Sequence, residues 1–159
     1  MPAAFTAAEY DRRRNAILAA MQSHGLDALL ISAPANITWA CGYDAWSFYT
    51  PQYLLVDQHG DLYWLGRLMD RGAARFTTYL PEAQVIAYPE NLVQRDGVHA
   101  GDWVGAWMRD HGLATAQIGY ESDAYMFSPR SLAALQAQLP DAAWKDTCLL
   151  YTSPSPRDS

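Results

Sequence analysis

Residues 32–52 read Ser-Ala-Pro-Ala-Asn-Ile-Thr-Trp-Ala-Cys-Gly-Tyr-Asp-Ala-Trp-Ser-Phe-Tyr-Thr-Pro-Gln, and they follow the apolar run Ala28–Ile31. A continuous apolar run is typical of a strand that is covered on both faces of its sheet. Pro34 and Asn36 favour a turn, so we expect the strand to end there. The sequence therefore predicts a buried strand that runs through a turn directly into a loop.

The predicted loop is rich in aromatic residues. Within residues 39–49 there are five aromatics and one carboxylate, Asp44; the aromatics are Trp39, Tyr43, Trp46, Phe48 and Tyr49. Aromatic side chains bury a large area and leave polar tips free, as in ligand-facing loops. The alternative interpretation is that these rings only cap one edge of the core, and composition alone does not separate the two.

Helices and strands alternate along the rest of the chain. Thr6 and Glu9 have the spacing of a capping box, and Gly25 is the expected end of the helix that they open. The apolar runs 53–56 and 62–65 flank a Gly-containing loop, which predicts a hairpin. Further helices are expected at 68–76, at 102–112 and between Ser128-Pro129 and Pro140, and further strands at 85–87, 118–120 and 143–145. This alternation predicts an α/β domain of three layers, a mixed sheet with helices on both faces.

Composition restricts the classes of function. Of the 159 residues, 50% are hydrophobic and 18% are charged, with a net charge of −6, which is typical of a globular domain. We expect no nucleic-acid partner, because the longest basic run, Arg12–Arg14, predicts only a solvated helix face. No membrane partner is expected either, since no apolar run approaches the ~20 residues of a membrane span. Cys41, the only cysteine before residue 148, fits a reducing compartment and a cytoplasmic location.

The sequence shows no cluster of catalytic or metal-binding residues. The histidines are scattered along the chain, at His24, His59, His99 and His111. His24 and His111 each precede a helix-ending glycine, where an imidazole can cap backbone carbonyls. Glu121 and Asp123 occupy alternate positions beyond a strand and could face the same way, but a solvated loop is the favoured explanation. We therefore expect neither a catalytic residue nor a metal ligand in this chain.

The order of residues resembles the amino-terminal domain of the creatinase and Xaa-Pro peptidase family. In that family the first strand is followed by a Pro-Asn-Ile/Met turn, an aromatic residue and Gly-Tyr/Phe. Within the family, Gly42-Tyr43-Asp44 running into Trp46–Tyr49 looks most like the ectoine hydrolases. The resemblance covers roughly residues 5–147 and continues, in order, through Gly66-Arg67, Asp70, Gly72-Ala73, Ile86, Tyr88-Pro89, Val93-Gln94, His99, Ile118-Gly119, Glu121, Asp123, Tyr125, Phe127-Ser128 and Leu139-Pro140.

This resemblance implies that residues 1–147 form a ribonuclease-H-like, non-catalytic domain. The family's hydrolases usually hold two divalent metals in a C-terminal metallohydrolase domain, through two Asp, one His and two Glu. All of these ligands would lie beyond Thr147. The amino-terminal domain commonly leans over the active site of its dimer partner, which implies a homodimer partner subunit and the chain's own C-terminal domain as partners. By itself the chain is then expected to be inactive and without a cofactor.

The resemblance also implies contacts to a small-molecule substrate. Ectoine is a small ring that carries an amidinium and a carboxylate, and Asp44 would pair with the amidinium. Arg67 would grip the carboxylate or, alternatively, form a surface ion pair with Asp70. The candidate rings for stacking on the cation are those of Tyr43, Trp46, Phe48 and Tyr49.

Two other functions remain open. An Xaa-Pro aminopeptidase or prolidase of the same family would act on a peptide, although bulky aromatics in the loop would restrict the room for an extended chain. The chain would otherwise be a stand-alone binding or dimerisation module.

Residues 148–159 differ in character from the rest. Cys148–Asp158 match, residue for residue, the translation of a sequencing-library transposase adapter; the alternative is a natural Ser/Pro-rich tail. We expect residues 148–159 to be non-native and exclude them from the fold. The C-terminal domain is then expected to be absent because the gene is cut short.

Overall fold

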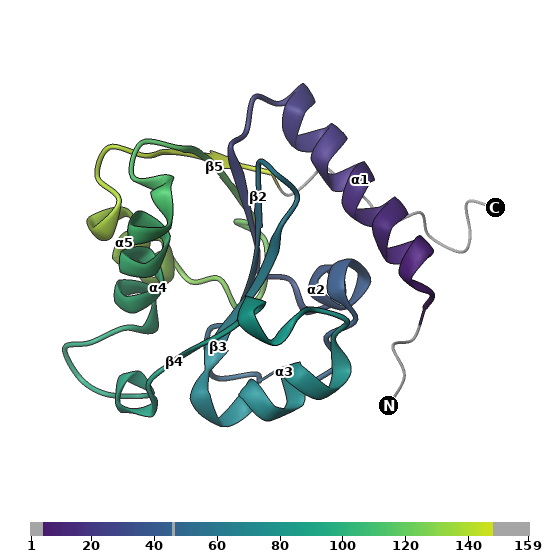
Figure 1. The fold of residues 1–159 in the computed structure, drawn as a ribbon. Coiled ribbons are helices and arrows are strands. Elements are labelled where there is room, and N and C mark those ends of the chain that lie inside the picture. The colour runs from purple at the N-terminus through teal and green to yellow at the C-terminus, as the bar shows by residue number, and fades with distance from the viewer. Residues whose placement is uncertain (1–4, 46, 148–159) are drawn as a thin grey trace.

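The computed structural model describes residues 5–45 and 47–147, which form a six-stranded mixed sheet between two layers of helices (Figure 1). The strand order is β4-β3-β2-β1-β5-β6. Neighbours β1, β2 and β3 pair antiparallel, whereas the pairs β3–β4, β1–β5 and β5–β6 are parallel. The strands are β1 (Ala28–Ile31), β2 (Tyr53–Asp57), β3 (Leu62–Arg67), β4 (Val85–Tyr88), β5 (Gln117–Tyr120) and β6 (Ala143–Asp146). The predicted three-layer α/β class is confirmed.

The helices divide between the two faces of the sheet. One face is covered by α1 (Ala7–Ser23), α2 (Pro34–Cys41) and α3 (Arg71–Thr77), and the other by α4 (Ala100–Met108) and α5 (Pro129–Gln138) (Figure 1). Short 3₁₀ turns connect them at 68–70, 82–84 and 90–92. The end of α4 widens into a further turn, Arg109–Leu113, in which Gly112 takes a φ of 88°.

The central strands β1 and β2 contribute side chains to the hydrophobic cores on both faces of the sheet. On β1, Leu29 and Ile31 join the cluster under α1–α3, while Ala28 and Leu30 join the cluster under α4 and α5. Successive side chains of a strand point to opposite faces, so an uninterrupted apolar run is required wherever both faces are covered. This is the physical basis of the prediction made from residues 28–31.

The turn expected at Pro34 is wrong, because Pro34 begins helix α2. Proline suits the first helical position, where its missing N–H would have no partner and its fixed φ already matches the helix. Gly42 ends α2 with a φ of 80°, and a Cβ there would lie 2.7 Å from the Tyr10 hydroxyl oxygen. The stretch 34–41 is therefore a helix, and the loop begins only at residue 43.

Two helix caps lie where the sequence predicts them, and a third, at His99, was not predicted. Thr6 accepts from the backbone N–H of Glu9 at 3.3 Å, and Ser128 accepts from that of Ser131 at 3.1 Å, as expected from their positions. Helix α4 begins two residues earlier than predicted, because His99 acts as its N-cap.

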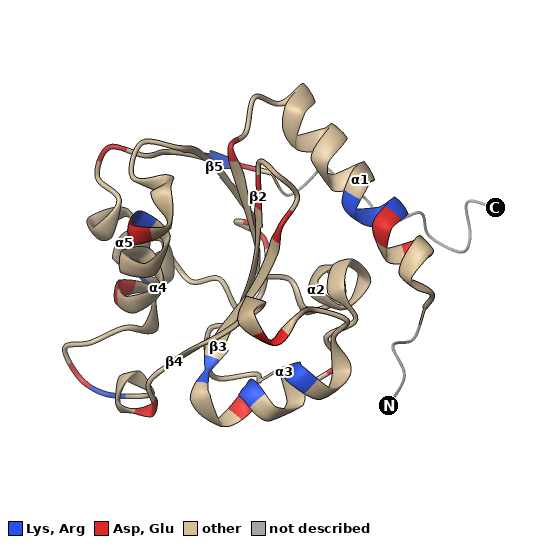
Figure 2. Cartoon of the chain, viewed as in Figure 1, with Lys and Arg blue, Asp and Glu red and all other residues tan. Residues whose placement is uncertain are grey.

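The solvated face predicted for Arg12–Arg14 is wrong for Arg13. Its guanidinium is buried, donates to Glu9 at 2.8 Å and to the Trp39 carbonyl at 2.9 Å, and lies 4.0 Å from the centroid of the Phe5 ring. A cation is held there by aromatic faces and a carboxylate, so Arg13 joins α1 to α2. Cationic and anionic residues are interspersed along α1, whereas the charged residues of α3 are the arginines Arg71 and Arg75 (Figure 2).

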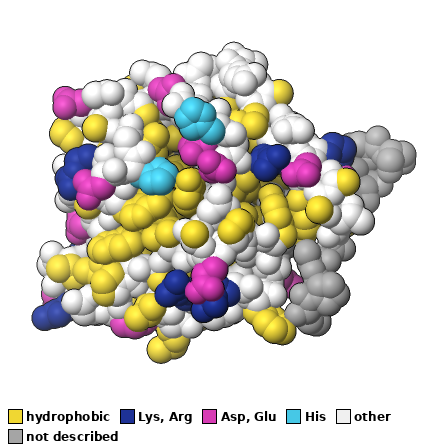
Figure 3. Space-filling model, viewed as in Figure 1, with side chains coloured by type: hydrophobic (Ala, Val, Ile, Leu, Met, Phe, Trp, Pro, Cys, Tyr) yellow, Lys and Arg dark blue, Asp and Glu magenta, His cyan; other side chains and the backbone are white. Residues whose placement is uncertain are grey.

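Hydrophobic side chains also gather on one outer face of the molecule (Figure 3). Several aromatic and aliphatic residues of β3, β4 and α4 are only partly buried against the core under α4 and α5: Tyr63, Ile86, Trp103 and Trp107. In the part of the chain that is described, no helix has both the length and the apolar character needed to cross a bilayer.

Candidate functional site

Residues 43–52, which join α2 to β2, carry most of the predicted substrate contacts. Trp46 lies outside the described residues. The structure separates the other candidates into those that hold the segment in place and those that face solvent: Tyr43 and Arg67 are buried, whereas Asp44, Phe48 and Tyr49 are exposed.

Tyr43 anchors the start of the segment. Its ring lies in the core, 5.3 Å from the ring of Trp64, and its hydroxyl donates to the Ala45 carbonyl and accepts from Nε2 of Gln52 at 2.9 Å. Burial, with Asp70 nearby, raises the pKa of the Tyr43 phenol well above its ordinary value. The phenol therefore stays neutral and serves as a hydrogen-bonding pivot.

Gln52 is the residue that closes the segment, and the sequence analysis did not identify it. Its Oε1 accepts from the backbone N–H of Ser47 at 3.0 Å, and its Nε2 also donates to Oδ2 of Asp70 at 2.9 Å. A buried amide with both ends satisfied fixes the geometry of what it touches. One sequence signal was present, since a polar residue stands directly before the apolar strand β2.

Arg67 continues this network from the end of β3. Its Nε donates to Oδ2 of Asp70 at 3.0 Å, and its Nη1 donates to the Tyr49 hydroxyl at 2.6 Å. Burial opposes the charge of Arg67, but the hydrogen bonds to Asp70 and Tyr49 outweigh it and its pKa is raised. The ion pair with Asp70 that the sequence offered as an alternative is present, but it is buried and not on the surface.

The exposed part of the segment is an aromatic pair beside a carboxylate. Phe48 is 68% exposed and Tyr49 is 43% exposed, with ring centroids 5.4 Å apart at an interplanar angle of 75°. The carboxylate of Asp44 is exposed as well, and its backbone N–H lies 3.5 Å from the Thr77 hydroxyl. Of the two interpretations of the aromatic loop, core capping fits Tyr43, whereas Phe48 and Tyr49 are exposed, with the Arg67 guanidinium 5.0 Å from the centroid of the Tyr49 ring.

Glu121 is buried, and the solvated loop favoured for it is wrong. Its Oε2 accepts from the backbone N–H groups of Ser32 and Ala33, both at 2.7 Å, and its Oε1 accepts from the amide of Asn36 at 2.5 Å. These N–H groups stand at the start of α2, where helical donors lack partners and the helix dipole favours an anion. The carboxylate at the end of β5 therefore fixes the position of α2. Asp123 is exposed.

Two histidines, His24 and His111, have structural contacts at helix ends. Nδ1 of His24 lies 2.9 Å from the Ala20 carbonyl at the end of α1, as predicted. His111 instead stacks on Trp107, with ring centroids 4.5 Å apart. Within residues 5–45 and 47–147, no three His, Cys, Asp or Glu side chains are placed to share a metal ion. The buried Cys41 is no nucleophile at neutral pH, because burial raises the pKa of its thiol to about 12.

The mixed sheet of this strand order, with helices on both faces and a hydrogen-bonded aromatic segment at one end, can be compared with the folds of known protein families. The chain belongs to the creatinase/prolidase N-terminal domain family, whose pattern matches residues 13–150. The resemblance found in the sequence is thereby confirmed.

Comparison with known proteins gives relatives within this family. The chain is 40% identical over 147 residues to the uncharacterized hydrolase/peptidase y4tM of Sinorhizobium fredii. The aligned region covers 92% of this chain and 38% of that protein. It is 36% identical over 143 residues to the ectoine hydrolase of Halomonas elongata. That aligned region covers 89% of this chain and 36% of the hydrolase. The chain thus spans a little over a third of the length of these relatives.

The fold itself is found in solved structures. The N-terminal domain of the cytoplasmic peptidase PepQ from Mycobacterium tuberculosis superposes on this chain with a TM-score of 0.61 at 21% identity. The match covers 85% of this chain and 92% of that one.

Proposed function

We propose that this chain is the amino-terminal, non-catalytic domain of an ectoine-hydrolase-like enzyme, which hydrolyses a cyclic amidine C–N bond. Its role there is to contribute dimer contacts and one wall of the substrate pocket. The observation that carries this proposal is the 36% identity to the ectoine hydrolase of Halomonas elongata, which extends over 89% of the chain.

The exposed surface of residues 43–49 supports this substrate class. A delocalised cation such as an amidinium stacks favourably on aromatic rings, and Phe48 and Tyr49 are exposed; the Arg67 guanidinium already lies 5.0 Å from the centroid of the Tyr49 ring. The exposed Asp44 supplies a carboxylate for the same cation. In the proposal Trp46 adds a further ring, and Tyr43 acts through its hold on the loop.

Arg67 has two roles in the proposed pocket. Its Nη1 donates to the Tyr49 hydroxyl, and its remaining guanidinium N–H groups are proposed to donate to the carboxylate of the substrate. Because the network through Gln52 and Asp70 orders the loop before any ligand arrives, less conformational entropy is lost on binding.

The remaining parts of the enzyme are proposed to come from outside this chain. The partners are a second subunit of a homodimer and a C-terminal metallohydrolase domain that can hold a divalent metal pair. The chain alone is proposed to be inactive, since no acid, base or nucleophile was assigned to it. A cytoplasmic location fits Cys41, the only cysteine before residue 148.

A second candidate function is that of an Xaa-Pro aminopeptidase or prolidase. The observation that favours it is the fold match to the N-terminal domain of the peptidase PepQ, at a TM-score of 0.61. A stand-alone binding or dimerisation module is the third candidate, and its support is limited to the exposed aromatic surface.

The first test is to sequence the source DNA beyond the codon of Thr147. A reading frame that continues into a domain with two Asp, one His and two Glu as metal ligands supports a hydrolase. A stop codon directly after Thr147 contradicts the proposal and leaves the stand-alone module.

The second test assays the full-length protein encoded there on ectoine and on an Xaa-Pro dipeptide. We expect Phe48→Ala and Asp44→Asn each to raise KM for ectoine about tenfold, because each removes a cation contact worth about 1.4 kcal/mol. Phe76→Ala is the matched control, since Phe76 is 64% exposed on α3, outside the segment. Hydrolysis of the dipeptide without hydrolysis of ectoine would select the second candidate.

A further inference from the structure

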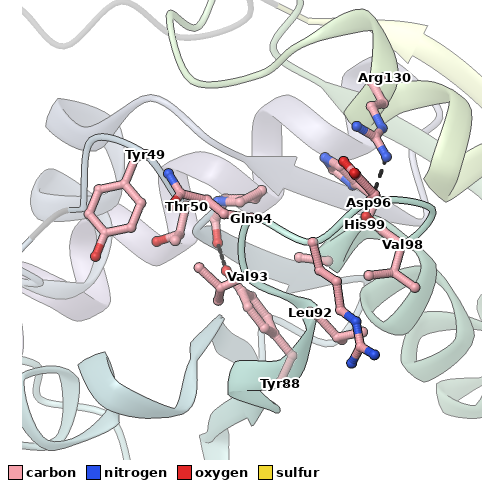
Figure 4. Close-up of a pocket in the computed structure, with 13 residues that line it drawn as sticks. Tyr49, Thr50, Tyr88, Leu92, Val93, Gln94, Asp96, Val98, His99 and Arg130 are labelled. Carbon is pink, nitrogen blue, oxygen red and sulfur yellow. Dashed lines mark hydrogen bonds between the residues drawn. The ribbon is translucent and has the colours of Figure 1, made fainter.

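A cavity of about 340 Å³ opens between the segment before β2 and the N-terminal ends of α4 and α5 (Figure 4). Its size is that of a site for a small organic ligand. Tyr88, Leu92 and Val93 provide apolar surface on one side. The charged groups that line it, and the imidazole of His99, come from residues 94–99 and from Arg130 on α5, two segments far apart in the sequence.

His99 presents a hydrogen-bond donor in this cavity. Its Nδ1 accepts from the backbone N–H of Gly101 at 2.9 Å, so in the neutral ring the proton resides on Nε2. Burial, together with the positive charge of Arg130, lowers the pKa of His99, which keeps the ring neutral. Among the described residues, none accepts a hydrogen bond from Nε2, so this N–H is available to a ligand.

Two guanidinium groups line the same cavity. Arg130 donates from Nη2 to the Val98 carbonyl at 3.3 Å, which places its charge beside the N-terminus of α4. Arg95 forms no ion pair or hydrogen bond within the described residues. Asp96 is the one carboxylate among the lining residues, and it lies beyond ion-pair distance of both arginines. The two arginines lining the cavity outnumber its one carboxylate, and neither forms an ion pair with it.

We propose that this cavity binds a small organic carboxylate, with the anion held by Arg130 and Nε2–H of His99, the charge of Arg95 also lining the cavity, and the body of the molecule against Tyr88, Leu92 and Val93. A planar guanidinium matches the two oxygens of a carboxylate. The apolar side of the cavity distinguishes an organic anion from a bare inorganic one. Tyr49 lines both this cavity and the surface of Asp44 and Phe48, but the groups that would bind the anion lie on other segments, so the proposal does not rest on the proposed function.

The test is a titration of the isotope-labelled chain with benzoate, with benzamide and with inorganic phosphate, followed by amide chemical shifts. Benzamide has the shape of benzoate without its charge, so the two probes separate anion recognition from burial of the ring. We expect saturable shifts with benzoate at Tyr88, Val93 and His99, and at least tenfold weaker binding of benzamide. Arg130→Gln should weaken benzoate binding at least fivefold.

Arg109→Gln is the matched control, because Arg109 is an exposed arginine outside the cavity, beside Asp110 and Gln138. Its benzoate affinity should equal that of the unchanged chain. Equal binding of benzoate and benzamide, an equal loss in both arginine variants, or no saturable shift would each overturn the proposal. Phosphate binding at the same amides as tightly as benzoate would overturn the assignment to an organic carboxylate.

Discussion

The carboxylate of Glu121 accepts the backbone N–H of Ser32 at 2.7 Å across a sequence separation of 89 residues. The same oxygen accepts from Ala33, so the end of β5 supplies the cap that the start of α2 lacks in its own sequence. Because α2 leads directly into the exposed aromatic segment, this contact sets where that segment begins.

Replacement of Glu121 is therefore expected to destabilise the fold. Glu121→Leu leaves two backbone donors and an amide without their acceptor, at a cost of about 3 kcal/mol in the free energy of unfolding. Glu121→Gln retains an acceptor oxygen and should cost about 1 kcal/mol. Urea denaturation checks both values through the midpoint at constant slope. Asp141→Asn, an exposed carboxylate, should stay within about 0.5 kcal/mol, and an equal loss there would contradict the assigned role.

Gln52 should control the order of the aromatic segment. Gln52→Leu removes the acceptor for Ser47 and the donor to Asp70, and we expect about 2 kcal/mol lower stability and faster amide exchange at Ser47. Gln136→Leu, at an exposed position of α5, is the control and should leave exchange at Ser47 unchanged. Unaltered Ser47 exchange in Gln52→Leu would show that the segment is held by other contacts.

His99 predicts a pH dependence of stability. Its pKa is lowered from its ordinary value of 6.5 by burial and by Arg130, so the folded state binds protons less readily than the unfolded chain. The stability that the neutral ring contributes is complete above pH 6.5 and is lost as the pH falls through the folded pKa. The amide of His99→Asn can still cap Gly101 but does not titrate, so its unfolding free energy should fall less steeply below pH 6.5.

The alanine variant completes this comparison. His99→Ala removes the cap altogether and should cost about 1 kcal/mol at neutral pH, where His99→Asn costs little. Chemical denaturation at several pH values measures all three proteins. Identical slopes against pH in the unchanged chain and in His99→Asn would rule out the histidine as the source.

Gly66 and Gly72 should respond to alanine in opposite directions. A Cβ on Gly66 would lie 2.3 Å from Cη2 of the buried Trp64, so Gly66→Ala should cost about 2–3 kcal/mol. A Cβ on Gly72, in α3, meets nothing within 4 Å, and Gly72→Ala should add about 0.5–1 kcal/mol. Thermal unfolding checks the pair: an unchanged midpoint in Gly66→Ala would contradict the packing described around Trp64, and a lower midpoint in Gly72→Ala would contradict the open space at Gly72.

Local signals explain what could be predicted from the sequence. The cap at Thr6, the hairpin of β2 and β3 and the stop at Gly25 depend on residues within a few positions of one another. Pro34 misled because a proline serves equally in a turn and in the first turn of a helix, and the helix is favoured here by distant contacts such as the carboxylate of Glu121.

The candidate site shows the same division. The aromatic and acidic character of residues 43–49 was evident, but the division between buried Tyr43 and exposed Phe48 depends on Trp64 and Gln52. Burial of Arg13 likewise depends on Trp39, which a second helix brings over it. Contacts between distant segments leave no local pattern in the sequence, so the burial or exposure of these side chains could not be predicted from it.

The position of β1 in the sheet has a consequence for the order of folding. Its antiparallel partner β2 follows within one short helix and loop, whereas its parallel partner β5 joins it through contacts such as Asp27 to Gln117, 90 residues apart. Closing a long loop costs more chain entropy than closing a short one, so the meander of β1, β2 and β3 can assemble first. On the ribosome, the nascent chain would hold one open sheet edge at β1 until β5 emerges, and during that interval it is exposed to mispairing with other chains.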